Sequence, residues 1–343
     1  MVCCYKIIIL KFRFTIITSM IFDASFSTTD ELPQAIEVCK IANKNGLDGV
    51  WINNLMTGGF DPFTLAAICF LNSKKMSLGI PVISPYIIRL ENIVRAASTL
   101  AELSANKFFL GLGVGGLNDL AYSNITPINP ISTLRETIHT LKTVFSNYKN
   151  SKLYSSQHIH PKYNTSVEVP IYLGVRGVKM LDLAGTDADG IILSGSKTYI
   201  KNAVKLVKRR IKESNQPNRQ FSFIAWIPTI IDPDNNSLKK AKSVISTIIT
   251  DTPKSAINIS DIDPDIEKKI KTTYREGGTE KASELVDEEM LTDFTITGDL
   301  KSVIDEYNAL EKIGITRSIL GPAPITIWRK KLSKFVRRWR LQE

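Results

Sequence analysis

The sequence predicts an α/β protein, organised as a single (β/α)8 TIM barrel with a helical insertion before the last repeat. Two observations lead to this fold class. Strand-like and helix-like segments alternate from about residue 20 onward, and eight strand-like segments fall within roughly 300 residues. A doubly wound sheet would need a Gly-x-Gly-x-x-Gly turn after its first strand, and residues 23–30 do not contain one.

Short apolar runs place the strands, and apolar residues at helical spacing place the helices between them. The expected strands are residues 20–26, 49–52, 76–83, 107–112, 169–173, 190–193, 220–229 and 316–320. A first helix ends before Asn45-Gly46, and the others are expected at 61–72, 90–104, 131–148, 177–184, 198–213, 237–250 and 299–313. Residues 251–297 break this rhythm with a Pro- and Asp-rich stretch and helical pieces rich in Lys and Glu, which predicts an insertion.

The charge of the chain is concentrated at its two ends. The 343 residues carry a formal charge of +10, of which residues 1–19 contribute +3 and residues 329–343 contribute +6. The remainder is close to neutral, so the sequence favours neither a nucleic-acid partner nor a membrane. The expected organisation is an N-terminal extension over 1–19, a barrel over 20–325 with the insertion 251–297, and a basic C-terminal helix or tail over 326–343. Met20 is an alternative start of synthesis.

The cysteine pattern gives no sign of a metal site or a disulfide framework. Cys3, Cys4, Cys39 and Cys69 show no Cys-x-x-Cys spacing. We therefore expect no metal and a reducing, cytoplasmic setting.

The functional site of a barrel lies at the carboxyl ends of its strands. The fifth strand ends in Gly174-Val-Arg-Gly177, directly before a helix. Free N–H groups at that helix start, with Arg176 and Lys179, would form a phosphate cradle. The alternative is a tight turn that simply requires glycine. Ser194 and Ser196 after the sixth strand would add donors to the same anion, or Ser196 would cap the next helix.

Glycines after the fourth strand and a proline in the third are further candidates. Residues 111–116 contain four glycines, which would leave a flat surface for a ring, or merely a flexible loop. Pro81 lacks a ladder donor, so it predicts an irregular third strand, unless that strand begins only at Val82. Asp23 is the acid of the first strand, and it is the candidate catalytic residue, with a buried polar role as the alternative.

These segments, in this order, resemble the bacterial luciferase-like superfamily. Within it they are similar to the archaeal methylenetetrahydromethanopterin reductases that use the deazaflavin coenzyme F420. The most specific stretch is residues 169–185, followed by Ala188-Asp-Gly-Ile191. Residues 42–52 and 100–113 are also similar, as are Gly298-Asp-Leu and residues 310–316.

The resemblance implies a cis peptide bond at Pro81–Val82, which would back the coenzyme ring, and hydride transfer to or from a one-carbon unit on a pterin-type carrier. It implies a role for Asp23 in orienting or protonating the substrate. The cofactor-binding residues it implies, together with those above, are Asn53, Pro81, Val82, Ile83, Gly113, Gly115, Gly174, Arg176, Gly177, Lys179, Ser194 and Ser196. We also expect a homo-oligomer.

Two departures from the reductase pattern leave the activity open. Asn54-Leu55-Met56 stands where the reductases usually carry Asp-His-Tyr, and Ser104-Ala-Asn-Lys107 replaces their Ser-Gly-Gly-Arg turn. The alternatives are an FMN-dependent monooxygenase and a barrel that binds a flavin or deazaflavin without turnover.

The basic C-terminal run has apolar residues at helical spacing. Leu332, Phe335 and Trp339 would pack on the barrel or on a second subunit, or would touch a membrane surface or an acidic partner.

Overall fold

Eight parallel strands close into a barrel, as the sequence predicts. The computed structural model describes residues 20–55, 59–73, 76–146, 168–321 and 325–341. The strands are β1 (Ile21–Ser27), β2 (Gly49–Asn53), β3 (Ser77–Ile83), β4 (Phe108–Leu112), β5 (Ile171–Gly174), β6 (Gly190–Leu193), β7 (Ser222–Ile231), β8 (Ile296–Gly298) and β9 (Arg317–Gly321). Their order is β6-β5-β4-β3-β2-β1-β9-β7-β8, and a further pairing of β6 with β7 closes the ring.

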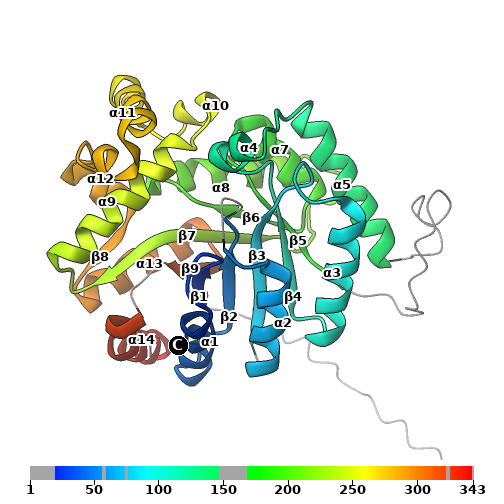
Figure 1. The fold of residues 1–343 in the computed structure, drawn as a ribbon, viewed down its shortest axis with the longest axis horizontal. Coiled ribbons are helices and arrows are strands. Elements are labelled where there is room, and N and C mark those ends of the chain that lie inside the picture. Colours follow the sequence, from blue (N-terminus) through cyan, green and yellow to red (C-terminus); the bar gives the residue numbers. More distant parts are fainter. Residues whose placement is uncertain (1–19, 56–58, 74–75, 147–167, 322–324, 342–343) are drawn as a thin grey trace, which may run out of the picture.

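Helices surround the barrel and follow its strands (Figure 1). They are α1 (Leu32–Lys44), α2 (Pro62–Asn72), α3 (Leu90–Leu103), α4 (Leu117–Tyr122), α5 (Pro130–Ser146), α7 (Val178–Asp187), α8 (Lys197–Lys212), α9 (Asn235–Thr250), α10 (Lys254–Ile257), α11 (Pro264–Ser283), α12 (Glu288–Phe294), α13 (Leu300–Ile313) and α14 (Ile325–Arg340). The expected helices agree with these within a few residues where the structure describes them.

Alternating side chains of each strand serve two different cores. One set packs outward against the helices, as Ala24, Val50 and Leu110 do. The other set fills the barrel interior, where Trp51, Phe109 and Tyr172 stack with ring centroids 5.5–6.2 Å apart. Ile192, Ile224, Ile319 and Trp226 complete this inner cluster. The barrel is therefore a packed core below its mouth.

Strand β7 is unusually long, and the helices α9 to α12 follow it in the chain. β7 has ten residues, and its last three, Thr229–Ile231, pair with β8 beyond the barrel. Helices α9, α11 and α12 form a second core of their own around Ile245, Ile249 and Ile270. Two elements were not predicted, namely β8, which has three residues, and α4, which has six. Both are too short to show a periodic pattern of apolar residues in the sequence.

The C-terminal helix packs on the barrel, which confirms one of the alternatives for this run. Phe335 and Trp339 are buried, and both contact Phe22 of β1 edge-on, with ring centroids 5.0 and 4.9 Å away. Figure 1 shows α14 beside α1, at the end of the molecule away from α11. The extension 1–19 lies outside the described residues. Within the described ranges, no helix is long and apolar enough to cross a membrane, and no cluster of three or more acidic, His or Cys side chains could hold a metal ion.

Candidate active site

The third strand is irregular where it reaches the barrel mouth. The Pro81–Val82 peptide bond is cis, as the resemblance implied. The register between β3 and β4 shifts from Ile80 to Ile83, which confirms the irregular strand. Asn54 holds this bend, since its backbone N–H donates to Pro81 O at 3.1 Å and its side-chain amide donates to Val82 O at 3.2 Å.

Val82 lies at the mouth between the ends of β4 and β5. A Cβ added at Gly174 would collide with Val82 Cγ1, and one added at Gly113 would lie 3.0 Å from Val82 Cγ2 and 2.9 Å from Gly174 O. Only glycine fits at these two positions, so the mouth has an apolar surface built by one side chain and bare backbone. Ile83, by contrast, is buried among the residues that face the helices.

Two further predicted residues lie at the same edge. Asn53 ends β2, and its carbonyl accepts a hydrogen bond from Thr28 N at 2.9 Å. Gly115 has φ of +109°, a conformation that favours glycine, and follows a loop in which Ser84 Oγ donates to Val114 O at 2.6 Å. The ends of β2, β3, β4 and β5 thus bring together Asn53, Pro81, Val82, Gly113, Gly115 and Gly174.

Arg176 has partners that the sequence did not reveal. Its Nε donates to Ser194 O at 3.0 Å, and its Nη1 donates to Ile248 O at 3.1 Å. Burial lowers the pKa of this guanidinium. Because its Nε and Nη1 donate to the carbonyls of Ser194 and Ile248, Arg176 links the loop after β6 to α9, and these two atoms are not presented to an anion.

The two serines after β6 differ in whether their hydroxyl groups have hydrogen-bond partners. Ser196 caps α8, since its Oγ accepts from Tyr199 N at 2.9 Å and donates to Ser260 O at 3.1 Å. Ser194 is buried, and its Oγ has no hydrogen-bond partner. Gly177 stands before α7 without a side-chain cap, and Lys179 is exposed in the first turn of that helix.

The mouth of the barrel has one surface that suits a flat ring and one position that suits a phosphate. The apolar surface at Val82 fits a flat ring, and the unpartnered Ser194 Oγ beside an uncapped helix start fits an anion. The space bounded by Arg176, Ser194 and Ser196 is about 10 Å³, which is room for one water molecule. Ser255 of α10 lies against Gly177, where a Cβ would be 2.8 Å from its Oγ. A phosphate therefore fits only with a displacement of α10.

Asp23 lies apart from the other predicted residues, near the amino-terminal ends of the strands. It pairs in register with Gly49, the first residue of β2. Its Oδ2 accepts hydrogen bonds from Trp51 Nε1 and Arg317 Nη1, both at 2.5 Å. Burial raises the pKa of this carboxyl, although the Arg317 charge acts in the opposite sense. This position in the barrel floor matches the buried polar alternative rather than a catalytic one.

A large cavity that the sequence did not reveal opens beside the mouth. It measures about 960 Å³ and lies between the ends of β1, β7 and β9 and the helices α1, α9 and α14. Phe26, Leu332 and Phe335 give it apolar walls, and Asp30 and Asp232 lie at its edge. None of the residues predicted to form the site lines it. Its existence depends on where α14 packs, which strand and helix periodicity do not specify.

Comparison with known proteins decides the family. The model of the luciferase-like monooxygenase family matches residues 12–317. The chain belongs to this family. The matched residues of this luciferase-like protein include the barrel from β1 to the first residue of β9.

Relatives of this luciferase-like protein include a 5,10-methylenetetrahydromethanopterin reductase of Methanolobus tindarius, 25% identical over 92% of this chain and 98% of the relative. Among solved structures, a coenzyme F420-dependent tetrahydromethanopterin reductase from Methanopyrus kandleri superposes with a TM-score of 0.77 at 20% identity, covering 93% of this chain and 99% of the other. The oxygenating constituent of 3,6-diketocamphane monooxygenase from Pseudomonas putida, in complex with FMN, gives 0.62 at 15% identity, with 94% and 98% covered.

Proposed function

We propose that this luciferase-like protein is a coenzyme F420-dependent oxidoreductase. Its reaction is hydride transfer to or from a one-carbon unit on a tetrahydromethanopterin-type carrier, between the methylene and methyl levels. The observation that carries the proposal is the nearly full-length similarity to a methylenetetrahydromethanopterin reductase. The apolar mouth around Val82 supports it, because it suits a stacked ring.

In such a reaction the protein mainly has to position the two reactants, and it contributes little acid–base chemistry. A reduced deazaflavin supplies the hydride when it is bound. Val82 would support one face of its ring, and Gly113 and Gly174 would let the ring approach the backbone. Ser194 Oγ and the N–H groups at the start of α7 would hold its phosphate. The inner cluster beneath the mouth would keep water away from the reacting face.

An anaerobic assay with reduced F420 and methylenetetrahydromethanopterin tests the proposal. We expect loss of reduced F420 that depends on the pterin, and saturable F420 binding by the protein alone. Purified protein that retains FMN and consumes oxygen would instead favour the monooxygenase. Tight F420 binding without turnover would favour a non-catalytic barrel.

The proposal also includes a homo-oligomer, which light scattering on the purified protein measures directly. A mass of one chain, 38.3 kDa, at assay concentration would contradict this part.

A further inference from the structure

Two cysteines that are distant in the sequence meet between the first two helices. Cys39 lies on α1 and Cys69 on α2, and both are free thiols buried from solvent. Their Sγ atoms are 2.9 Å apart. A disulfide bond requires about 2.05 Å between sulfurs, so an approach of less than about 1 Å joins them.

Small neighbours allow this close approach of the helices. Ala42 lies one turn after Cys39 on α1, and Ala66 lies one turn before Cys69 on α2, and both alanines are fully buried. With short side chains on the facing surfaces, the two helix axes can approach closely enough for the sulfurs to meet.

We propose that Cys39 and Cys69 are a modification site, where a reversible disulfide links α1 to α2. One Sγ–Sγ bond forms and two S–H bonds break. The two electrons and two protons pass to a low-molecular-weight disulfide, which is cleaved to two thiols. The exchange goes through a mixed disulfide on one cysteine, which the second cysteine then resolves.

The surroundings make this a slow site. The hydrogen bond to Cys69 and burial both raise the pKa of the Cys39 thiol, which disfavours the reactive thiolate. Oxidation therefore requires α1 and α2 to open transiently. We expect its rate to increase steeply as the temperature approaches the unfolding midpoint.

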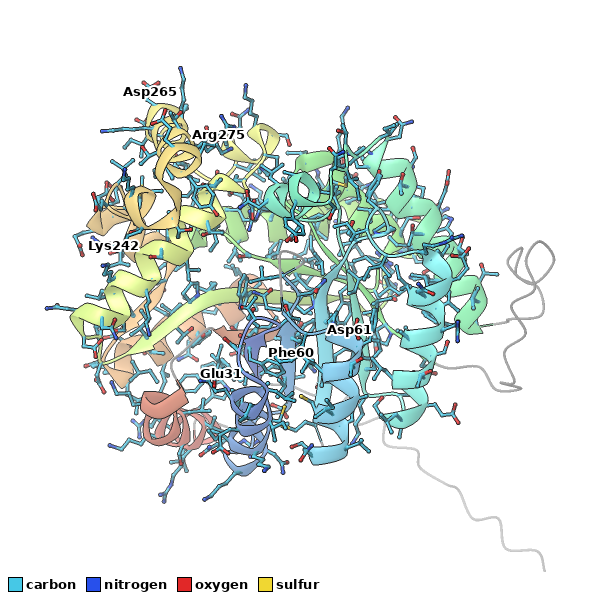
Figure 2. The ribbon with its side chains drawn as sticks, viewed as in Figure 1. Glu31, Phe60, Asp61, Lys242, Asp265 and Arg275 are labelled. Atoms are coloured by element: carbon cyan, nitrogen blue, oxygen red, sulfur yellow. The ribbon has the colours of Figure 1, made fainter. Side chains whose placement is uncertain are left out.

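The bond would join two helices whose preceding loops already contact each other. Leu55 N donates to Thr28 Oγ1 at 3.0 Å, and Phe60 N donates to Thr28 O at 2.8 Å, so the loops after β1 and β2 already hold each other. In Figure 2, Glu31 at the start of α1 lies close to Phe60 and Asp61 at the start of α2. A covalent link between α1 and α2 would make the stability of this part of the barrel depend on whether the two cysteines are oxidised.

The test uses the full chain with Cys3 and Cys4 replaced by Ser, which leaves one pair of thiols. The protein is incubated with glutathione disulfide at 25 °C and near its melting midpoint, then unfolded and alkylated. We expect both thiols to disappear, and a protease fragment linking residues 14–40 to residues 45–74, which dithiothreitol separates. Two alkylated cysteines after incubation at both temperatures would overturn the proposal.

Matched variants separate the cross-link from general thiol chemistry. In the same background, Cys39→Ala and Cys69→Ala should each keep one alkylatable thiol and give no linked fragment. Oxidation should raise the thermal midpoint of the two-cysteine protein by roughly 5 °C and leave both variants unchanged. An equal shift in the alanine variants would contradict the cross-link. None of these readouts depends on the proposed function.

Discussion

Ser194 and Ser196 show how two like residues in one loop acquire different roles. The hydroxyl of Ser196 is satisfied by Tyr199 and Ser260, whereas that of Ser194 is buried without a partner. A buried polar group without a partner carries an unfavourable free energy until a ligand satisfies it. Ser194 is therefore the residue of this loop that a bound anion would use.

Replacing Ser194 by Ala should weaken F420 binding about tenfold, because one hydrogen bond to a charged group is lost. Stability of the free protein should not fall, since no protein contact is lost. A titration of F420 fluorescence against each variant measures the affinity, and denaturant unfolding measures the stability.

Ser196→Ala is the matched control for that experiment. It removes the cap of α8 and should cost about 1 kcal/mol in the free energy of unfolding. Equal affinities in wild type and Ser194→Ala would show that the phosphate binds elsewhere.

The raised pKa of Asp23 gives stability a definite dependence on pH. Burial lifts this pKa above 3.8, so the unfolded chain ionises the carboxyl at a lower pH than the folded protein does. Between the two pKa values unfolding releases a proton, and the contribution of Asp23 to stability falls as pH rises. Asp23→Asn does not titrate there. The stability of wild type relative to this variant should therefore decrease as the pH rises above about 4.

Denaturant unfolding of both proteins at several pH values checks this. Asp265→Asn, which changes an exposed acid of α11, should leave the pH dependence nearly as in wild type. A relative stability that increases with pH would mean that Arg317 outweighs burial at Asp23.

At the scale of elements, Arg176 connects α9 to the loops that follow β5 and β6. Arg176 lies in the loop after β5 and donates to the carbonyl of Ser194, directly after β6, and to that of Ile248 in α9. Arg176→Met would leave these carbonyls unpaired, and should cost about 2 kcal/mol. In this variant, the rate of amide hydrogen exchange should increase more in α9 than in α1. Lys242→Met is the control, because this α9 lysine pairs with the exposed Glu288 and its loss should change little.

Elements with strong periodicity were predictable, and those defined by tertiary contacts were not. The strand at Phe108–Leu112 and the helix at Leu90–Leu103 follow directly from their apolar patterns. β8 exists because the end of β7 offers it an edge, a partnership that no local pattern encodes. The position of the irregular third strand came from Pro81 together with the family resemblance.

The site was likewise predictable only where it did not depend on tertiary contacts. The location of the glycines and Val82 at strand ends was predictable because the barrel fold fixes where strand ends meet. The carbonyl partners of Arg176 were not predictable, because one of them, Ile248 in α9, lies 72 residues away. The position of Asp23 on the first strand was known, but its distance from the mouth depended on the register with β2.

At the scale of the whole molecule, α14 closes the outer layer next to β1. Phe335 is fully buried among Phe22, Tyr307 and Trp339. Phe335→Ala should cost about 3–5 kcal/mol in the free energy of unfolding, since it removes the buried ring that packs against Phe22, Tyr307 and Trp339. Lys334→Ala, one residue away on the exposed side, should change stability by less than about 0.5 kcal/mol. Similar losses in both variants would contradict the packing.

The stack of Trp51, Phe109 and Tyr172 has a kinetic consequence. Together with Arg317, whose guanidinium lies 4.9 Å from the Phe109 ring centroid, it gives the barrel a solid floor. Two ligands that share the mouth must then use one entrance. Whichever lies deeper has to arrive first and depart last, so initial-rate kinetics with two substrates should follow a compulsory order.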